Sequence, residues 1–463
     1  MYKKGHIHFV GIGGIGMSGI AKIMRSTGYK VSGCDLDHNQ KSIIDLKNLG
    51  CLIYRGNDTP DCQDESIDTL VYSSAISDHN QEIMNARKRG IPTIPRALML
   101  AEIMRTKFSI AVTGAHGKTT VTSLIAHILM EAQHDPTVIV GGHLQNISSN
   151  ARLGKGEFVV VEADESDRSF LRLYPTIAVV TNIDLEHLET YTDLEDIKAS
   201  FLKFISHVPF YGKAILCADD DNIRSLLPQH HIKTLLYGID HEADLYAQEI
   251  LLEKEYSTCL VYKKGKAQPL GPLMLTMPGR HNVLNALAAL TTAMEVGISF
   301  EEAAQALRNF KGIDRRFTNK GTFQGATLID DYGHHPTEIF NTLQVARKRT
   351  SNRLIVVFQP HRYSRTEKLW DDFVNLFVRS SIDELIFTDI YPASEAPRPG
   401  ITAENLAQAI QKKNPSFPVH YMPYEKEWTH IISHLKKNVN KDDLVLLQGA
   451  GKVNTIADML QSF

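Results

Sequence analysis

Two glycine-rich stretches constrain the fold of this chain more than any other feature of its sequence. Residues 10–19 are VGIGGIGMSG and residues 112–120 are VTGAHGKTT. Each stretch follows an apolar segment typical of a buried strand and precedes a segment with helical spacing of apolar residues. A strand–loop–helix unit of this kind is typical of a parallel sheet covered by helices. The two stretches therefore predict an α/β fold with anion-binding loops at two strand ends.

The strand–loop–helix units occur in three series, which predicts three domains. A length of 463 residues also favours about three domains, at roughly 100–200 residues each. A new series of strand–loop–helix units begins near residue 107 and another near residue 314. We therefore expect a Rossmann-like N-terminal domain at 1–107, a central P-loop domain with a mainly parallel sheet at 108–313, and a Rossmann-like C-terminal domain at 314–463.

Composition excludes several classes of protein. The net charge is −3, so no basic field indicates a nucleic-acid partner. No apolar run is long enough to predict membrane insertion, and the N-terminus lacks the pattern of a signal peptide. The five cysteines are scattered without a CxxC pair, which predicts neither a disulfide framework nor a zinc site. A cytoplasmic location is the simplest expectation.

The first loop has the spacing of a dinucleotide fingerprint. Gly11, Gly13 and Gly16 form GxGxxG, and Asp35 ends the following strand. Glycines let the backbone approach a pyrophosphate, and the helix N-terminus supplies partial positive charge. A nucleotide diphosphate in the substrate, a dinucleotide cofactor such as NAD, and a ligand-free tight turn all remain open.

The second loop predicts an ATP site with Mg²⁺. Lys118 would reach the β and γ phosphates, and the Thr119 hydroxyl would contact the metal ion. The spacing is GxxGKTT from Gly114, shorter than the usual P-loop. The apolar run in EFVVVEADESD ends in an acidic segment that contains Glu162, Asp164, Glu165 and Asp167, where Mg²⁺ would be held beside the loop. His187 ends TIAVVTNIDLEH and is a further candidate ligand near the nucleotide.

Taken together, these stretches resemble the Mur ligase family over essentially the whole chain. The resemblance is carried by GIGGIGMSGIA, YSSAI, GAHGKTTVTSL, EADESD, TNIDLEHLETY, PGRHNVLNALAAL, DRRF, DDYGHHPTE and FQPHRYSRT. DDYGHHPTE together with HRYSRT is the most specific combination. The resemblance implies a domain for a UDP-sugar, a central ATPase and a C-terminal Rossmann-like domain that closes over ATP and the amino acid.

The resemblance also implies roles for individual residues. The ATP site would comprise Gly114, Ala115, His116, Gly117, Lys118, Thr119, Thr120, Asn282, Asn285, Arg316, Asp331, Tyr332 and His334. Thr119 and Glu162 would hold one Mg²⁺, and His187 would hold a second Mg²⁺. The UDP pocket would comprise Gly11, Gly13, Gly14, Ile15, Gly16, Asp35, Ser73 and Ser74. Arg362 and Arg365 would pair with substrate carboxylates, and the catalytic group would be Lys118, His187, Arg362 and Arg365.

The closest resemblance within the family is to the branch that joins L-alanine to UDP-N-acetylmuramate in peptidoglycan precursor synthesis. It implies an ATP-dependent reaction through an acyl phosphate, and a monomer or weak homodimer. Sister ligases use a carbamylated lysine to hold a second metal ion. Phe201 occupies the matching position here, and Lys198 is three residues away, so no such role is expected for Lys198. A sister ligase that adds another amino acid or a peptide, an NAD-dependent oxidoreductase and a non-enzymatic nucleotide-binding module are the alternatives.

Overall fold

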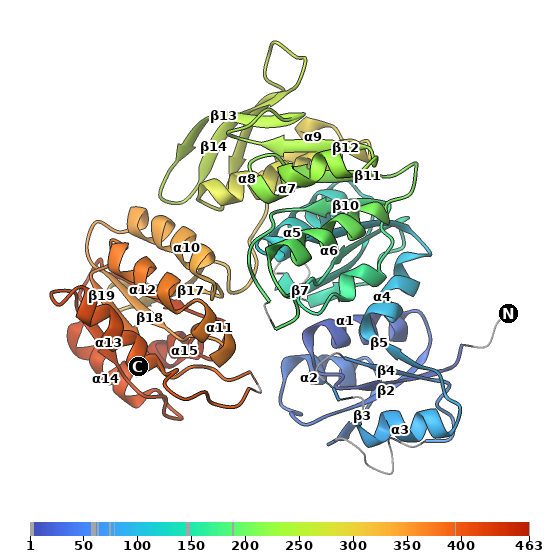
Figure 1. Cartoon of the computed structure of the whole chain (residues 1–463), viewed down its shortest axis with the longest axis horizontal. Helices are drawn as coiled ribbons and strands as arrows, with labels where there is room; N and C mark the ends of the chain where they lie inside the picture. The colour runs from blue at the N-terminus through green and yellow to red at the C-terminus, as the bar shows by residue number, and fades with distance from the viewer. Residues whose placement is uncertain are drawn as a thin grey trace. The chain divides into compact units, whose positions relative to one another are not determined.

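The computed structural model describes residues 4–56, 62, 64–73, 76–77, 79–144, 149–187, 189–393 and 395–462. Three β-sheets with helices packed against them make up the fold (Figure 1). The chain divides into two compact units: residues 1–250, 259–274 and 283–311 form the first, and residues 251–258, 275–282 and 312–463 form the second. The first unit contains the first sheet and most of the second, and the second unit contains the third.

The first sheet is entirely parallel and has the strand order β3-β2-β1-β4-β5. Side chains of the central strand β1 are buried throughout, as expected where helices cover both faces. Gly33 lets β2 approach β1, since a Cβ atom there would lie 2.6 Å from the Phe9 carbonyl oxygen. The elements are β1 (His6–Val10), α1 (Ile15–Ser26), β2 (Lys30–Asp35), α2 (Lys41–Asn48), β3 (Leu52–Arg55), β4 (Thr69–Tyr72), α3 (Gln81–Lys88), β5 (Thr93–Pro95) and α4 (Arg96–Met104).

The second sheet has ten strands in the order β15-β14-β13-β12-β11-β10-β6-β9-β7-β8. Its strands β12, β11, β10, β6, β9 and β7 pair in parallel, and β8 is antiparallel to β7. Near-continuous apolar sequence in β6, β9 and β10 matches their position in the middle of this sheet. The β9 and β10 strands flank β6, so the carboxyl ends of all three lie together.

The elements of the central part of the chain follow in order. They are β6 (Phe108–Thr113), α5 (Lys118–Glu131), β7 (Thr137–Leu144), β8 (Ser149–Arg152), β9 (Phe158–Glu162), the 3-10 helix η3 (Ser169–Arg172), β10 (Ile177–Val180), α6 (Leu194–Ser206), β11 (Lys213–Cys217), α7 (Asp221–Leu226), the 3-10 helix η4 (Leu227–Gln229), β12 (Thr234–Gly238), β13 (Leu245–Leu252), β14 (Ser257–Lys263), β15 (Gly271–Leu275), α8 (Arg280–Glu295) and α9 (Phe300–Arg308).

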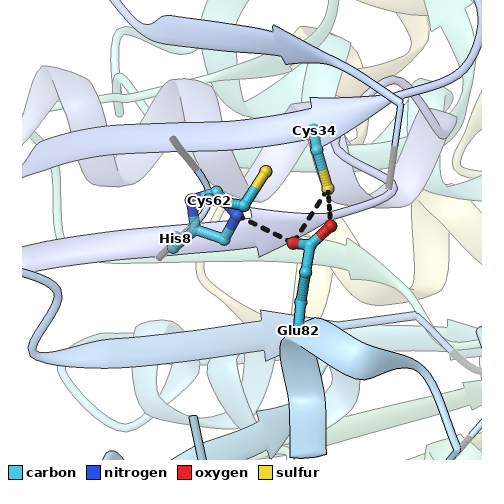
Figure 2. Close-up of side chains that lie close together, drawn as sticks. All are labelled: His8, Cys34, Cys62 and Glu82. Atoms are coloured by element: carbon cyan, nitrogen blue, oxygen red, sulfur yellow. Dashed lines mark hydrogen bonds and ion pairs between the residues drawn. The ribbon is translucent and has the colours of Figure 1, made fainter. Parts of the chain in front are cut away.

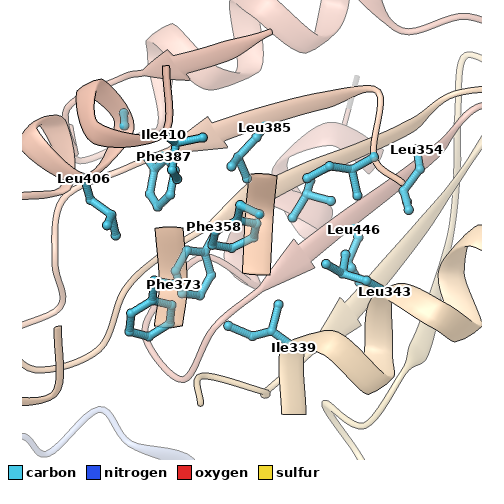
Figure 3. Packing of buried hydrophobic residues seen from close by; sticks show 14 of the residues in the cluster. Ile339, Leu343, Leu354, Phe358, Phe373, Leu385, Phe387, Leu406, Ile410 and Leu446 are labelled. Carbon is cyan, nitrogen blue, oxygen red and sulfur yellow. The ribbon is translucent and has the colours of Figure 1, made fainter. Parts of the chain in front are cut away.

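The third sheet has the order β16-β17-β21-β18-β19-β20, parallel except for the β16–β17 hairpin. Successive side chains of β18 point to opposite faces of the sheet and so contribute to two hydrophobic cores, one on each face. Phe358 packs on one face with Phe373 and Phe387 (Figure 3), and Val357 packs on the other face. The elements are β16 (Thr318–Phe323), β17 (Ala326–Asp331), α10 (Pro336–Arg349), β18 (Leu354–Phe358), α11 (Tyr363–Lys368), α12 (Trp370–Arg379), β19 (Glu384–Phe387), α13 (Ala403–Lys413), β20 (Val419–Tyr421), α14 (Thr429–Asn438), β21 (Leu444–Gln448) and α15 (Thr455–Gln461).

These sheets confirm the predicted α/β class with three domains and mainly parallel sheets. The predicted boundaries near residues 107 and 314 remain predictions. Among the described helices, none combines the length and the apolarity that crossing a bilayer requires.

Candidate active site

The loop between β6 and α5 adopts a conformation that only glycine accommodates at two positions. Gly114 and Gly117 have φ of 136° and 82°, in the left-handed region that side chains disfavour. A Cβ atom at Gly114 would collide with the Thr181 hydroxyl, and one at Gly117 would lie 2.7 Å from Asn285 Oδ1. Neighbouring side chains therefore enclose the loop closely. The loop leads into the N-terminus of α5, where backbone N–H groups can bind an anion.

Residues that follow β10 hold this loop in place. The backbone N–H of His116 donates to Asn182 Oδ1 at 2.8 Å, and the backbone N–H of Ala115 donates to the Asn182 carbonyl at 3.2 Å. The Thr181 hydroxyl donates to the His116 carbonyl at 2.6 Å. Thr120 is buried in the first turn of α5. These hydrogen bonds anchor the loop at Ala115 and His116 to the segment after β10.

The Lys118 ammonium group lies inside the loop. Its Nζ donates to the carbonyl oxygens of Gly114 and Ala115 at 2.6 and 3.0 Å, and it pairs with Glu165 Oε1 at 2.8 Å. Burial opposes the charge on Lys118, yet the neighbouring Glu165 carboxylate raises its pKa above the ordinary value. Lys118 is thus a charged group at the position where a P-loop lysine meets phosphate.

A carboxylate and a hydroxyl meet next to Lys118. The Thr119 hydroxyl donates to Glu162 Oε2 at 2.9 Å, and the backbone N–H of Gly141 donates to the same oxygen at 2.8 Å. Burial raises the pKa of Glu162, although Lys118 and these two donors act against that rise. Oxygen ligands of this kind suit Mg²⁺, so Thr119 and Glu162 fit the predicted metal site.

His187 belongs to a second group of candidate metal ligands with Glu165 and Glu186. Its Nε2 lies 3.4 Å from Glu165 Oε1 and 3.6 Å from Glu186 Oε2, and its Nδ1 lies 3.4 Å from Glu189 Oε1. Burial alone would lower the pKa of His187, but hydrogen bonds to Glu165 and Glu189 raise it to about 9. A metal ion bound by His187 would have to displace that proton.

Glu165 has a more specific position than its place in the acidic segment EADESD predicts. Its side chain is 4% exposed and contacts both Lys118 and His187. The Tyr191 hydroxyl also donates to the Glu165 backbone carbonyl at 2.6 Å. Glu165 therefore joins the phosphate loop to the predicted metal ligand, a link that strand-end position alone does not reveal.

The first loop connects β1 to α1 and is closed by Asp35. The backbone N–H of Gly13 donates to Asp35 Oδ2 at 2.8 Å, and a Cβ atom at Gly13 would lie 2.8 Å from the same oxygen. Gly11 has φ of 75°, and its N–H donates to the Cys34 carbonyl at 3.0 Å. Gly11 and Gly13 therefore lie beside the end of β2, where Asp35 contacts Gly13, as the spacing of the motif predicts.

Two other predicted UDP-pocket residues, Gly14 and Ile15, lie at the end of this loop and the start of α1, and Ser73 follows a neighbouring strand. The backbone N–H of Gly14 donates to the Gly11 carbonyl at 3.3 Å, and Ile15 begins α1 with 52% of its surface exposed. Ser73 directly follows β4, the other neighbour of β1, and its carbonyl accepts from the Ile76 N–H at 3.0 Å. Ser74 lies outside the described residues.

Arg96 is a candidate that the sequence did not reveal. A Cβ atom at Gly16 would lie 3.0 Å from Arg96 Nη1, so the guanidinium group reaches the N-terminal turn of α1. Its Nη2 lies 3.8 Å from Asp164 Oδ2 and 3.5 Å from the Ser169 hydroxyl. Arg96 therefore connects the first loop to the acidic segment after β9, and the two are far apart in sequence.

In the C-terminal domain, Asp331 organises the segment DDYGHH. Its Oδ1 accepts from the backbone N–H of Gly333, the Thr342 hydroxyl and Gln448 Nε2 at 2.8–3.0 Å, and its Oδ2 accepts from the backbone N–H of Phe317 at 2.9 Å. The carboxylate is buried by these contacts. The structure thus gives Asp331 a positioning role, and a direct contact with nucleotide remains a prediction.

Tyr332 lies against two arginine side chains. Arg315 and Arg316 have guanidinium carbons 4.9 and 5.4 Å from the centre of its ring. The His334 ring is edge-on to Tyr332 at 5.4 Å, and Glu338 lies 3.6 Å from Arg316. Arg316, Tyr332 and His334 therefore form one group, as expected if they bind a common ligand.

Arg362 directly precedes α11 and Arg365 lies within it; the nearby His361 ring is 5.4 Å from the ring of His334. Arg362 has φ of 71°, and its N–H donates to the Tyr391 carbonyl at 2.8 Å. Arg365 Nη1 lies 3.3 Å from His361 Nδ1. Burial, followed by electrostatic interaction with His334, Arg365 and Arg362, lowers the pKa of His361 to about 2. His361 is therefore neutral beside cationic groups that suit a carboxylate or phosphate ligand.

The remaining predicted residues lie on helices. Asn282 and Asn285 are one turn apart on α8, and Asn282 Nδ2 donates to the Pro278 carbonyl at 2.9 Å. Phe201 on α6 is buried against Phe170 at a ring distance of 5.3 Å. Lys198 Nζ instead pairs with Glu195 at 2.8 Å. The position that would hold a carbamylated lysine in sister ligases is thus part of an aromatic core.

Comparison with known proteins gives matches over nearly the whole chain. Three consecutive family models match: the catalytic domain of the Mur ligase family at residues 6–108, the Mur ligase middle domain at 112–293, and the glutamate ligase domain of Mur ligases at 315–451.

Individual relatives agree with these models. A UDP-N-acetylmuramate–L-alanine ligase from Syntrophotalea carbinolica is 48% identical over 98% of this chain and 97% of its own length. One from Syntrophus aciditrophicus is 46% identical over 99% and 94%, respectively. The crystal structure of UDP-N-acetylmuramate-alanine ligase from Thermotoga maritima superposes with a TM-score of 0.80, at 28% identity over 99% of this chain and 98% of that one. The chain therefore belongs to the Mur ligase family.

Proposed function

We propose that this chain is an ATP-dependent ligase that joins L-alanine to the lactyl carboxylate of UDP-N-acetylmuramate, a step in peptidoglycan synthesis. The single observation that carries this proposal is 46–48% identity to UDP-N-acetylmuramate–L-alanine ligases over nearly the whole chain. The two glycine loops agree with it, because the reaction needs one site for ATP and another for the UDP moiety.

The chemistry follows from the weakness of a carboxylate as an electrophile. Transfer of the γ-phosphoryl group from ATP to a carboxylate oxygen forms an acyl phosphate and releases ADP. The alanine amine then attacks the acyl carbon and gives up a proton, and phosphate leaves with its electron pair. Splitting one difficult step into two easier ones is the usual benefit of an activated intermediate.

Residues of the second loop suit the first of these steps. Lys118 would stabilise charge that develops on the transferred phosphoryl group, from a position fixed by Gly114 and Ala115. We propose that Thr119 and Glu162 hold one Mg²⁺ and that His187 holds a second; when bound, these ions neutralise phosphate charge. Arg362 and Arg365 would orient substrate carboxylates.

A panel of acceptors tests the proposed specificity. Phosphate release from ATP would be measured with UDP-N-acetylmuramate and, in turn, L-alanine, glycine, D-glutamate and the tripeptide L-alanyl-γ-D-glutamyl-meso-diaminopimelate. L-alanine should give the highest kcat/KM, and omission of the UDP-sugar should abolish release. A higher kcat/KM for another acceptor would contradict the proposal.

The tripeptide belongs in the panel because a specific observation favours a second candidate. A ligase from Neisseria meningitides named for UDP-N-acetylmuramate and this tripeptide is 28% identical in structure-based comparison, with a TM-score of 0.63 over 68% of this chain. We rank peptide ligation second because this TM-score is below the 0.80 of the alanine ligase structure and the identity is below the 46–48% of the alanine ligase relatives.

The first loop provides a separate prediction. Gly13→Val should lower UDP-N-acetylmuramate affinity about 10-fold or more, because its Cβ atom would press on Asp35 where the backbone must approach pyrophosphate. Calorimetry with ATP provides the internal control, since ATP binding should persist. Unchanged UDP-sugar affinity, or micromolar NAD binding to the unaltered protein, would show that this loop serves another ligand.

A further prediction concerns the metal site of sister ligases. Lys198→Ala should keep at least about half of the activity, because its pair with Glu195 is a local helix contact of small energetic value. Activity should also be independent of added bicarbonate. If Lys198→Ala lost most of its activity and added short carboxylic acids restored it, Lys198 would be a carbamylated metal ligand.

Location and assembly complete the proposal. A cytoplasmic location would give the enzyme access to ATP and to a nucleotide-linked sugar. We also propose that the chain is a monomer or a weak homodimer. Analytical ultracentrifugation across a range of protein concentrations should show a single monomer, or a monomer–dimer equilibrium shifting with concentration.

A further inference from the structure

The N-terminal domain contains a buried group of four potential metal ligands away from the glycine loops. His8 lies on β1, Cys34 on β2, Cys62 between β3 and β4, and Glu82 in the first turn of α3. The four side chains converge on one point (Figure 2). We call them the Cys–His–Glu cluster. The sequence predicted no zinc site because its cysteines are scattered, but the parallel sheet brings these separate segments together.

Distances within the cluster fit a single metal ion. Cys34 Sγ lies 3.1 Å from both carboxylate oxygens of Glu82, and His8 Nε2 lies 3.2 Å from Glu82 Oε2. One ligand atom from each of the four residues lies within 4.8 Å of the others. Zinc–ligand bonds of about 2.0–2.3 Å in a tetrahedron place the ligand atoms about 3.3–3.8 Å apart. Small side-chain movements would therefore complete the coordination.

Contacts behind His8 orient its ring for such a role. Its Nδ1 lies 2.8 Å from the Ser32 hydroxyl, and that hydroxyl lies 2.7 Å from His6 Nε2. If Nδ1 donates to Ser32, Nε2 is left with its lone pair directed at the cluster. A metal-binding histidine usually has its other nitrogen held in this way. The Ser32 contact thus supports the cluster independently of the ligands themselves.

The surroundings of the cluster are closed and apolar. His8, Cys34, Cys62 and Glu82 are each at most 4% exposed. Cys34 and Cys62 pack with Val10, Leu70 and Ile83, with Tyr54 and Tyr72 at the edge. A carboxylate in such a place is costly unless other charges or hydrogen bonds compensate it. A divalent cation would offset two of the three negative charges carried by the carboxylate and the two thiolates, and so would favour ionisation of both thiols.

We propose a structural zinc site in the N-terminal domain, with four ligands: His8 Nε2, Cys34 Sγ, Cys62 Sγ and a Glu82 carboxylate oxygen. Thiolate and imidazole ligands select zinc over magnesium. Binding forms two zinc–sulfur bonds and releases the two thiol protons to solvent. Four protein ligands leave no position for a substrate, so the ion cross-links β1, β2, α3 and Cys62 between β3 and β4, and takes no part in the reaction.

The site would also support the first glycine loop. Cys34 precedes Asp35, and its carbonyl accepts from the backbone N–H groups of Gly11 and Ile12 at 3.0 Å each. An ion bound to Cys34 would therefore fix the part of β2 that carries these contacts. This proposal does not depend on the reaction that the chain catalyses.

Zinc content and cobalt absorption test the site in the full-length chain. The protein would be reduced, incubated with ZnCl2, passed over a chelating resin and analysed for metal. It should retain about one zinc per chain, and Cys62→Ser and Glu82→Gln should each retain less than about a tenth. Cys51→Ser, a buried cysteine of the same domain outside the cluster, should retain zinc like the unaltered protein.

Cobalt distinguishes this site from the other candidates. Co²⁺ bound to the unaltered protein should give thiolate charge-transfer and tetrahedral absorption bands, because two ligands are sulfur. Among the described residues, the other groups of potential metal ligands contain no cysteine. The cobalt spectrum needs no variant, so it decides the question even if Cys62→Ser fails to fold.

Three outcomes would overturn the proposal. Absence of thiolate bands with all five cysteines reactive after unfolding would show a metal-free cluster. Two fewer reactive thiols after unfolding of the purified protein in chelator, with the lost pair mapped to Cys34 and Cys62 by peptide mass spectrometry, would show a disulfide in place of the metal site. Zinc retained equally in Cys62→Ser and the unaltered protein would place the ion elsewhere.

Discussion

Lys118→Ala should reduce phosphate release by about 10³-fold or more, which corresponds to a loss of about 4 kcal/mol in transition-state stabilisation. The loss is expected because Lys118 Nζ is fixed by two loop carbonyls and by Glu165 at the start of α5. Initial rates would be measured with saturating ATP, UDP-N-acetylmuramate and L-alanine. A variant that keeps about a tenth of the activity would contradict the assignment.

This substitution needs a control for folding, because Glu165 is buried and loses one of its two charged partners. Calorimetry with UDP-N-acetylmuramate provides it, since the first loop and Asp35 are untouched and affinity should stay within about twofold. Lys155→Ala removes an exposed lysine of the same domain and should leave turnover unchanged.

Glu162→Gln should reduce kcat/KM by about 10²–10³-fold and raise the Mg²⁺ concentration needed for half-maximal activity about 10-fold or more. The glutamine side chain keeps the size of the original and an oxygen for the backbone N–H of Gly141, so mainly the charge is lost. Activity would be titrated with MgCl2 at fixed total ATP.

The matched control for this experiment is Glu157→Gln. Glu157 is exposed and directly precedes β9, the strand that ends at Glu162. Its Mg²⁺ titration should coincide with that of the unaltered protein. Coincidence of the Glu162→Gln titration as well would exclude Glu162 as a metal ligand.

The sequence predicts best what depends on short-range geometry. Gly114 and Gly117 could be recognised because a left-handed φ and a tight enclosure require glycine at a strand–helix junction. The pairing of Gly13 with Asp35 was equally predictable, since parallel strands β1 and β2 end at the same edge of the sheet. The α/β class followed from the same strand–loop–helix units.

Contacts between segments far apart in the chain could not be predicted from the sequence. Arg96 meets the start of α1 and the segment after β9, and no local spacing relates these positions. The four hydrogen bonds that the Asp331 oxygens accept within its own domain were likewise not visible in the sequence, while its contact with nucleotide stays a prediction. The Cys–His–Glu cluster is a third case, because its ligands come from four segments that only the sheet aligns.

The central claim is that the carboxylate is activated by phosphorylation, and oxygen transfer tests it most directly. UDP-N-acetylmuramate labelled with ¹⁸O in its lactyl carboxylate would be converted with ATP and L-alanine, and the released phosphate would be analysed by mass spectrometry. An acyl phosphate requires one carboxylate oxygen to leave with phosphate, so phosphate should carry a single ¹⁸O. Phosphate without ¹⁸O, released together with the alanyl product, would contradict the account.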